Sequence, residues 1–190
     1  IVNSMLFYWF LTDLVFRFFF QKLPVMSVKP LLTLPIKRSY VVNFVLGKSA
    51  LSFFNYLPLF AIVPFGIALI TNDYPIGAVL GWMLGMVLVT LIINFLNFII
   101  ESFSSETDLS MLPVIVLTGG LYALNHYNII SFSNIISDGF DAIYNLPVFN
   151  LALVVLLGLL YWFNFILLSN ELFLDSGLKT KIEAVTACYL

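Results

Sequence analysis

The sequence has few charged residues and almost none of the side chains that build metal or disulfide sites. Only 9% of its 190 residues are charged, against about 25% in an ordinary soluble domain. The single cysteine, Cys188, excludes an internal disulfide, and the single histidine, His126, has no companions at metal-ligand spacing. We therefore expect no metal and no other cofactor, and we do not expect a water-soluble globule.

Motifs for nucleotide binding, nucleic-acid binding and catalysis are also missing. The Gly47-Lys48-Ser49 sequence lacks an upstream glycine-rich loop and enters an apolar segment, so it is not a Walker A motif. The net charge of -2 comes without the basic tract or aromatic platform of a nucleic-acid-binding surface. No Ser/His/Asp set, pair of membrane carboxylates or histidine cluster supports an intramembrane enzyme. We predict that the chain is not an enzyme and binds no nucleic acid.

Long hydrophobic runs dominate what is present. Hydrophobic residues make up 62% of the chain, and their runs approach the roughly 20 residues that cross a bilayer as a helix. We predict an all-α polytopic integral membrane protein, a single transmembrane domain in which an external interfacial segment precedes the last span. The expected spans cover residues 4–20, 50–70, 76–100, 109–124 and 147–168, with a cytoplasmic basic loop at 21–48 and the interfacial segment at 125–146.

The positions of the Lys and Arg residues predict the orientation. Five of the eight lie in the loop 21–48 and two follow the last span, whereas the loops 71–74 and 125–146 contain none. Cytoplasmic loops retain positive charge. With five crossings the basic loop and the C-terminal segment lie on one side, so we expect both to be cytoplasmic.

One pair of opposite charges lies inside the first predicted span. Asp13 and Arg17 are four residues apart, a spacing that allows an ion pair along one helix face. Charges inside a membrane usually face protein or water and are functional candidates. Two interpretations stay open. Either Arg17 extends toward the interface while Asp13 neutralises it, or the pair forms a gating contact with another helix.

Small and amide side chains in the spans predict helix packing. Gly77, Gly81 and Gly85 repeat every four residues, which allows another helix to approach the backbone closely. Three amides deep in the spans are expected to form interhelical hydrogen bonds or to contact a substrate: Asn94, Asn97 and Asn164. Trp82 and Tyr161 lie too deep in the predicted spans to act as interfacial anchors.

The basic loop has the layout of an amphipathic cytoplasmic helix. Apolar residues precede Lys37 and Arg38, and Ser39 then offers an N-cap for a helix through Phe44. On charge alone, this segment is equally typical of an anchor that binds anionic lipid head groups.

The stretch LTLPIKRSYVVNFVLGKSAL, residues 32–51, together with FRFFFQKLPV upstream, resembles the permeases of type-2 ABC exporters, specifically a poorly characterised bacterial family of permease-like membrane proteins. The order of the elements is similar along most of the chain. The resemblance implies one further span upstream, so we expect the chain to be a fragment. It also implies a location in the bacterial cytoplasmic membrane and a dimer of permease subunits or halves.

In such permeases a cytoplasmic coupling helix contacts a separate ATP-binding cassette subunit, which hydrolyses ATP. The resemblance therefore implies an interface with that subunit at Pro35, Lys37, Arg38, Ser39 and Lys48. The alternative is a membrane scaffold or assembly factor without transport activity, whose basic loop binds lipid or another partner. Neither the substrate nor the direction of transport follows from the sequence.

Overall fold

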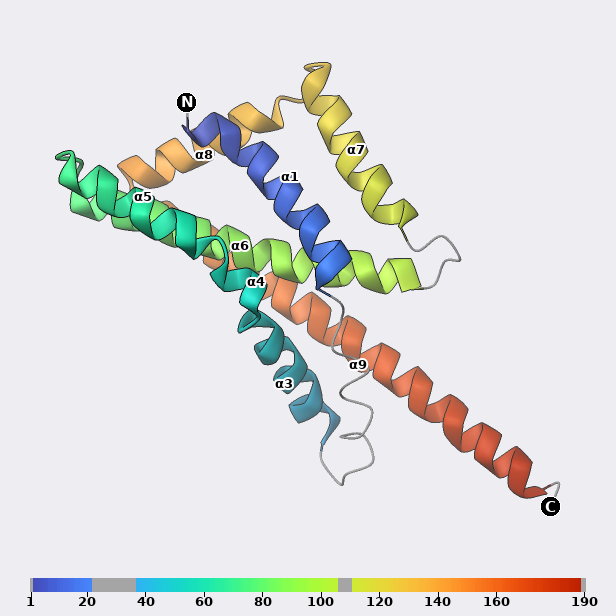
Figure 1. Cartoon of the computed structure of the whole chain (residues 1–190). Coiled ribbons are helices and arrows are strands. Elements are labelled where there is room, and N and C mark those ends of the chain that lie inside the picture. The colour runs from blue at the N-terminus through green and yellow to red at the C-terminus, as the bar shows by residue number, and fades with distance from the viewer. Residues whose placement is uncertain (1, 22–36, 106–110, 189–190) are drawn as a thin grey trace.

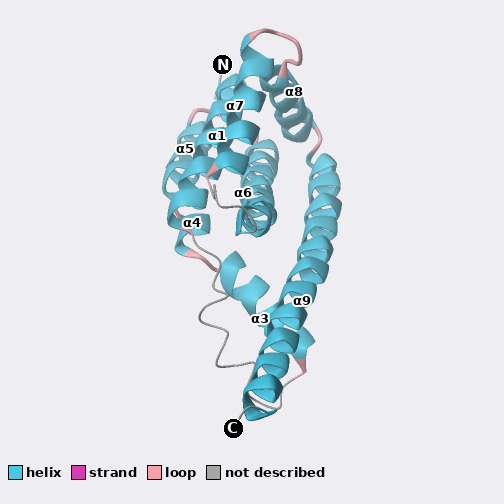
Figure 2. Cartoon of the chain, turned by 90° about the vertical axis from the view of Figure 1, so that its right-hand side faces the viewer, coloured by secondary structure: helices cyan, strands magenta, loops and turns pink. Residues whose placement is uncertain are grey.

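The computed structural model describes residues 2–21, 37–105 and 111–188, and this part of the chain is helical, with no strand. Figure 1 shows the helices in chain order, and Figure 2 shows the last helix, α9, running along one side to the C-terminus at the far end. The prediction of an all-α fold is confirmed.

Two helices are long and apolar enough to cross a membrane. They are α6 (Ile76–Ser105), with its apolar stretch Ile76–Glu101, and α9 (Asn150–Cys188), whose apolar stretch Pro147–Asn170 includes the preceding turn η2 (Pro147–Phe149). These two stretches contain the third and fifth predicted spans. Among the described residues the number of spans rises to three if a bent pair of helices crosses as one.

The bent pair contains three short helices in succession: α3 (Arg38–Ala50), α4 (Phe53–Tyr56) and α5 (Leu59–Thr71). The direction changes by 59° between the part ending at Tyr56 and α5. Pro58 lies at this bend, where proline has no N–H to continue the helix.

The sequence predicted a span beginning near residue 50, after a loop in which Ser39 is the N-cap of a helix. The helix instead begins at Arg38 with Lys37 at the N-cap position, and Ser39 lies inside it. The described end of the predicted basic loop is therefore helical and continuous with the bent pair.

The first and fourth predicted spans correspond to α1 (Val2–Phe20) and α7 (Leu112–His126). Helix α7 is apolar but has 15 residues, fewer than the roughly 20 of a full crossing. Helix α1 contains both charges of the Asp13–Arg17 pair and is not among the two helices of membrane-spanning composition.

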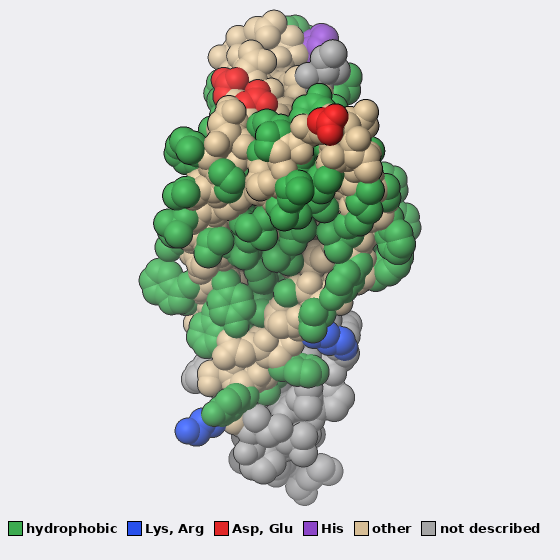
Figure 3. Space-filling model, turned by 90° about the vertical axis from the view of Figure 1, so that its left-hand side faces the viewer, with side chains coloured by type: hydrophobic (Ala, Val, Ile, Leu, Met, Phe, Trp, Pro, Cys, Tyr) green, Lys and Arg blue, Asp and Glu red, His purple; other side chains and the backbone are tan. Residues whose placement is uncertain are grey.

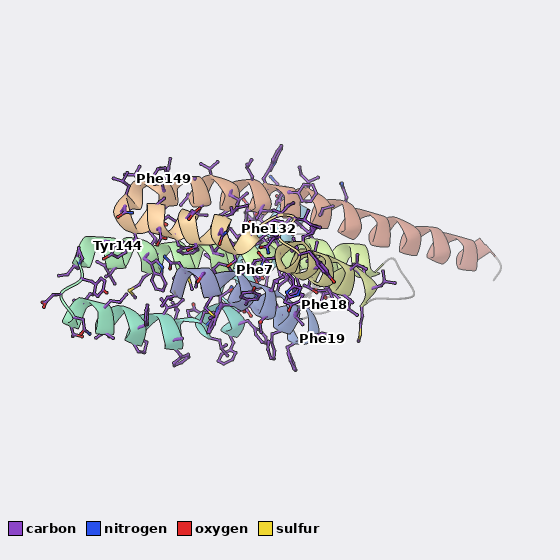
Figure 4. The ribbon with its side chains drawn as sticks, turned by 90° about the horizontal axis from the view of Figure 1, so that it is seen from above. Phe7, Phe18, Phe19, Phe132, Tyr144 and Phe149 are labelled. Carbon is purple, nitrogen blue, oxygen red and sulfur yellow. The ribbon has the colours of Figure 1, made fainter. Side chains whose placement is uncertain are left out.

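Helix α8 (Phe132–Asn145) lies within residues 125–146, the segment predicted to be interfacial, and begins later than the predicted start at residue 125. Its apolar face, including Phe140 and Ile143, is buried, and it packs mainly on α1 and α6. Its first residue stacks on Phe7 of α1, with ring centroids 6.0 Å apart (Figure 4). Helix α8 thereby joins the N-terminal helix to α6.

The buried side chains form two hydrophobic clusters that share α6. The upper cluster joins α1, α5, α6 and α8, and its members are Leu6, Ile62, Trp82, Met86 and Phe140. The lower cluster joins α3, α6 and α9, and its members are Val41, Val42, Val45, Leu46, Phe95, Phe98 and Leu168. Between Met86 and Phe95, α6 carries the polar residues Thr90 and Asn94, both buried.

The outer surface is apolar in the middle and charged at the ends. Many large hydrophobic side chains are more than half exposed, among them Phe60 and Val148 at 78% each. Figure 3 shows hydrophobic side chains over the middle of one face, acidic groups toward one end and basic groups toward the other. Asp138 and Asp141 belong to α8 and Asp73 to the turn between α5 and α6, and we call the end of the molecule that these elements form in Figure 1 the acidic end. Such an apolar belt is compatible with a membrane protein.

Candidate functional site

Buried and half-buried polar side chains gather where α1 passes the breaks in the α3–α4–α5 helix, between the two hydrophobic clusters. We call this group the polar junction, and its members are Asp13, Arg17, Gln21, Ser49, Asn55 and Asn94. Arg17 has no exposed surface at all. Since Lys and Arg are almost never fully buried without partners, the contacts of this guanidinium decide what the junction does.

The Arg17 guanidinium uses all three of its nitrogens. Nε donates to Asp13 Oδ2 at 2.8 Å, which makes the ion pair that the four-residue spacing predicts. Nη1 donates to Asn55 Oδ1 at 2.7 Å and to Gln21 Oε1 at 3.2 Å. Nη2 donates to the Phe54 carbonyl at 2.8 Å. Arg17 therefore bonds to another helical segment and does not extend toward an interface. Of the two interpretations left open above, the structure favours contact with another helix.

The bond to Phe54 has a direct cause in the sequence. In a continuous helix the Phe54 carbonyl would accept from the N–H of residue 58, but that residue is Pro58 and has no N–H. A buried carbonyl without a donor is costly. The Arg17 Nη2 group supplies the missing donor, and α1 thereby stabilises the bend.

Asn55 does the same for the earlier break, at the end of α3. Its Nδ2 donates to the carbonyl of Ser49 at 3.1 Å and of Ala50 at 2.8 Å. The Ser49 carbonyl also accepts from the Ser52 N–H at 2.9 Å. Ala50 is the last residue of α3, and its carbonyl has no partner within a helix that stops there. Side chains thus satisfy backbone groups at both interruptions, as required of a broken helix in an apolar environment.

Asn94 connects the junction to α6. Its Oδ1 accepts from Gln21 Nε2 at 2.5 Å, and its Nδ2 donates to Ser49 Oγ at 2.9 Å. The network therefore runs from α1 through α3 and α4 to α6. A movement of any one of these helices must break hydrogen bonds to the others or carry the others with it.

The chemistry of the junction is structural and mechanical. One cation faces one carboxylate, and the other polar members are neutral amides and a hydroxyl. In the ranges that the structure describes, no three His, Cys, Asp or Glu side chains come together as metal ligands. What the arrangement can do is keep a bent helix in one geometry, and release it if Arg17 changes partners.

The residues expected to contact an ATPase subunit lie on and before α3. Lys37, Ser39 and Lys48 are exposed, whereas Pro35 and the side chain of Arg38 lie outside the described residues. Lys37 and Lys48 are eleven residues apart, about three helical turns or 16 Å, so they share one face. Tyr40 and Phe44 lie between them on that face and are 66% and 56% exposed. We call Lys37, Tyr40, Phe44 and Lys48 the outer face of α3.

The opposite face of α3 belongs to the lower cluster. Val42, Val45 and Leu46 are at most 1% exposed and belong to the same cluster as Phe95 of α6 and Leu168 of α9. The predicted amphipathic helix is therefore packed against the two longest helices. A force applied to its outer face would reach α6 and α9 directly.

The three glycines of α6 differ in their surroundings. A Cβ at Gly81 would lie 2.9 Å from the side chain of Pro147, and one at Gly85 would lie 3.1 Å from Asn150 Oδ1. A Cβ at Gly77 would meet nothing within 4 Å. The close approach of α6 to η2 and the start of α9 therefore uses Gly81 and Gly85.

The deep aromatic and amide residues have specific partners, with one exception. Trp82 Nε1 donates to Asn3 Oδ1 at 3.0 Å, and the Tyr161 hydroxyl donates to Asn43 Oδ1 at 2.8 Å. Asn164 donates to a carbonyl of α6 at 3.1 Å. Asn97 is fully buried, and neither atom of its amide has a hydrogen-bond partner among the described residues.

Sequence reasoning missed Gln21, Ser49 and Asn55 as parts of the site. Their partners are distant in the chain, for example Asn55 and Arg17 at a separation of 38 residues. The one local signal is Asn55 itself, an amide in an apolar segment just before Pro58.

A family model described as "Family of unknown function (DUF5687)" matches residues 1–188, nearly the whole chain. No curated protein and no solved structure matches the chain.

Proposed function

We propose that this chain, which belongs to the family of unknown function DUF5687, is the membrane-spanning permease part of an ABC-type transporter. It would act as an exporter, together with a separate ATPase subunit and a second permease subunit or half. The observation that carries the proposal is the bent α3–α4–α5 helix, whose broken backbone is bonded by the buried Arg17 of another helix.

Bent and interrupted helices are a recurring device of transporters, where irregular backbone at membrane depth is tolerated only inside protein or beside a cavity. A buried Arg inside a membrane helix is a functional candidate, because placing a charge there is costly. Here Arg17 makes the bend of one helix depend on the position of another. A transporter needs such a dependence, because the displacement of one helix by a partner subunit must rearrange the other spans.

The packing of α3 determines how a displacement caused by the ATPase subunit would reach the spans. Its outer face, with Lys37 and Lys48, is the surface offered to the ATPase subunit. Its inner face packs on α6 and α9, and its last turn contributes Ser49 to the polar junction. Closure of the ATPase would displace α3, and the polar junction would pass that displacement to α1 and α6.

The proposal includes five crossings, with α1 and α7 crossing in addition to the bent pair, α6 and α9. The separation of charge supports this arrangement. Exposed Lys37 lies at the start of α3, and Figure 1 shows α3 toward the end opposite α8 and the α5–α6 turn, which contain Asp73, Asp138 and Asp141. By the positive-inside rule the basic end faces the cytoplasm. We place the chain in the bacterial cytoplasmic membrane.

A pull-down of the intact protein tests the proposal. Wild-type protein should co-purify an ATP-binding cassette protein, and the double variant Lys37→Glu, Arg38→Glu should lose it. Charge reversal removes the attraction to acidic or polar groups on the partner and introduces repulsion. Asp138→Lys, a reversal at the other end, is the matched control and should retain the partner.

Resistance to alkaline extraction reports whether each variant remains inserted in the membrane. Equal retention of the ATPase by both variants would place the interface elsewhere. Reproducible absence of any ATPase from wild-type preparations would contradict the transporter.

The alternative is a membrane scaffold or assembly factor. It is favoured by the composition of the outer face of α3, where two Lys residues flank two exposed aromatic rings. Basic and aromatic side chains together suit an anionic lipid surface. Vesicle binding that depends on Lys37 and Lys48, without any bound ATPase, would support this function.

A further inference from the structure

A cavity of about 390 Å³ opens at the acidic end, far from the outer face of α3. Residues from α1, α5, α6 and α8 line it, together with the turn between α5 and α6. Its volume lies within the range of small-molecule sites, about 300–1,000 Å³. Neither the polar junction nor the proposed coupling surface uses it.

The cavity combines aromatic rings with one carboxylate. Phe65, Tyr74, Trp82 and Tyr144 contribute the rings, and Asp141 contributes the carboxylate. None of the described residues that line it is Lys, Arg or His. Figure 4 shows Tyr144 on α8, near the end of the molecule where α5 turns into α6.

The walls are set in place by a chain of hydrogen bonds. Trp82 Nε1 donates to Asn3 Oδ1 at 3.0 Å, and Asn3 Nδ2 donates to Asp141 Oδ1 at 2.6 Å. The Trp82 ring is 6% exposed and lies 5.6 Å from the Phe65 ring, tilted by 54°. The indole and the carboxylate are thus oriented before any ligand arrives, which lowers the cost of binding.

Aromatic faces and a carboxylate around one space attract an organic cation. The negative face of each ring attracts an ammonium group, and Trp is the strongest of the three ring types. Asp73 and Asp138 are exposed at the same end, and charges of one sign near a cleft raise the local concentration of counter-ions. A hard metal ion would need more oxygen ligands than one carboxylate supplies.

We propose that this cavity binds an organic ammonium ion, with Asp141 as counter-ion and Trp82 and Tyr144 against its alkyl groups. The site does not depend on the ATPase partner, so binding and coupling succeed or fail separately.

Choline chloride is the probe, titrated against the purified protein in detergent. Its neutral isostere, in which a tert-butyl group replaces the trimethylammonium group, is the matched ligand control. Equilibrium dialysis with labelled choline reports on binding directly. A change in tryptophan fluorescence, to which Trp9, Trp82 and Trp162 all contribute, is the second measurement. We expect saturable binding of choline and at least about tenfold weaker binding of the isostere, which lacks the cation–π attraction.

Asp141→Asn removes the charge and keeps an oxygen to accept from Asn3, so we expect at least tenfold weaker choline binding with an unchanged unfolding temperature. Tyr144→Leu removes a ring at similar bulk and should also weaken binding. Asp138→Asn, on the same helix but not among the residues that line the cavity, should bind like wild type. If Asp141→Asn alters the unfolding temperature, its weaker binding could come from a changed fold. The choline affinity of Tyr144→Leu then decides whether the cavity is the binding site.

Three results would overturn the proposal: no saturable choline binding in the millimolar range, equal affinity for choline and its isostere, or unchanged affinity when the deciding residue is replaced.

Discussion

Two neighbouring turns of α6 carry the same residue type in opposite situations. Asn94 belongs to the polar junction, where it bonds to Gln21 of α1 and Ser49 of α3. Asn97, three residues later, is as fully buried but has no hydrogen-bond partner in the part of the chain that the structure describes. A buried amide is stabilising only where its donors and acceptors are satisfied. The difference teaches that the amide of Asn94 connects α6 to the bent helix through Ser49. The turn that contains Asn97 is packed through its apolar neighbours Phe95 and Phe98, which belong to the lower cluster.

The glycines of α6 repeat this contrast at its other end. Gly81 has the ring of Pro147 against it, whereas Gly77 has open space where a side chain would lie. Both residues are glycines inside the same helix, so their helix propensities are identical. A difference in stability between the same substitution at the two positions therefore reports tertiary contact alone. In each pair of α6, Asn94 with Asn97 and Gly81 with Gly77, one position is the control for the other.

The largest expected effect comes from removing the centre of the junction. Arg17→Met should lower the free energy of unfolding by about 3–5 kcal/mol, because it leaves Asp13 without its cation and the Phe54 carbonyl without a donor. Reversible unfolding in mixed detergent micelles, followed by tryptophan fluorescence, measures this. The double variant Asp13→Asn, Arg17→Met removes the uncompensated charge and should recover part of the loss. If Arg17→Met were neutral, the bend would not depend on α1.

Asn94→Leu should have the next largest effect. It leaves the Gln21 amide and the Ser49 hydroxyl without their partner on α6, which costs about 1–3 kcal/mol in the same unfolding measurement. The comparison between the two turns requires the stability change of Asn97→Leu as well, which is the last prediction below. A loss equal to that at Asn97 would contradict the distinction between the two turns.

Gly81→Ala should destabilise by about 1–2 kcal/mol, because the new Cβ would lie 2.9 Å from Pro147. Gly77→Ala is the matched control. It meets no neighbour and should be neutral or up to about 1 kcal/mol more stable, since Ala favours helix over Gly. The two variants can be compared by thermal unfolding at one protein and detergent concentration. Shifts of the same sign would show that α6 does not approach η2 closely.

Asn97→Leu should have the smallest effect and the opposite sign. Replacing an unsatisfied buried amide with an apolar side chain of comparable size removes a desolvation cost, so we expect between no change and about 1 kcal/mol of added stability. Unfolding beside Asn94→Leu measures the contrast. A loss of more than 1 kcal/mol would reveal that Asn97 has a partner in the native protein, and the comparison between the turns would fail.

The sequence predicted part of the candidate site. The spacing of Asp13 and Arg17 predicted an ion pair, and the pair is present at 2.8 Å. It did not predict that Arg17 also bonds to Phe54 and Asn55, because those residues lie on a helix that approaches α1 only after folding. It treated Asn94 and Asn97 alike, since spacing and composition carry no information about which amide meets a donor from another helix.

Composition and apolar runs, read from the chain alone, determined that this protein is all helical, with helices of membrane-spanning length, because the hydrophobic effect and local backbone hydrogen bonding act on neighbouring residues. Pro58 determined a break in the second helical segment, because proline has no N–H to continue a helix. Only the tertiary structure decided where the broken backbone finds its donors, and that α3 packs on α6 and α9. Those contacts depend on which distant surfaces fit together, and that information is spread over residues far apart in the chain.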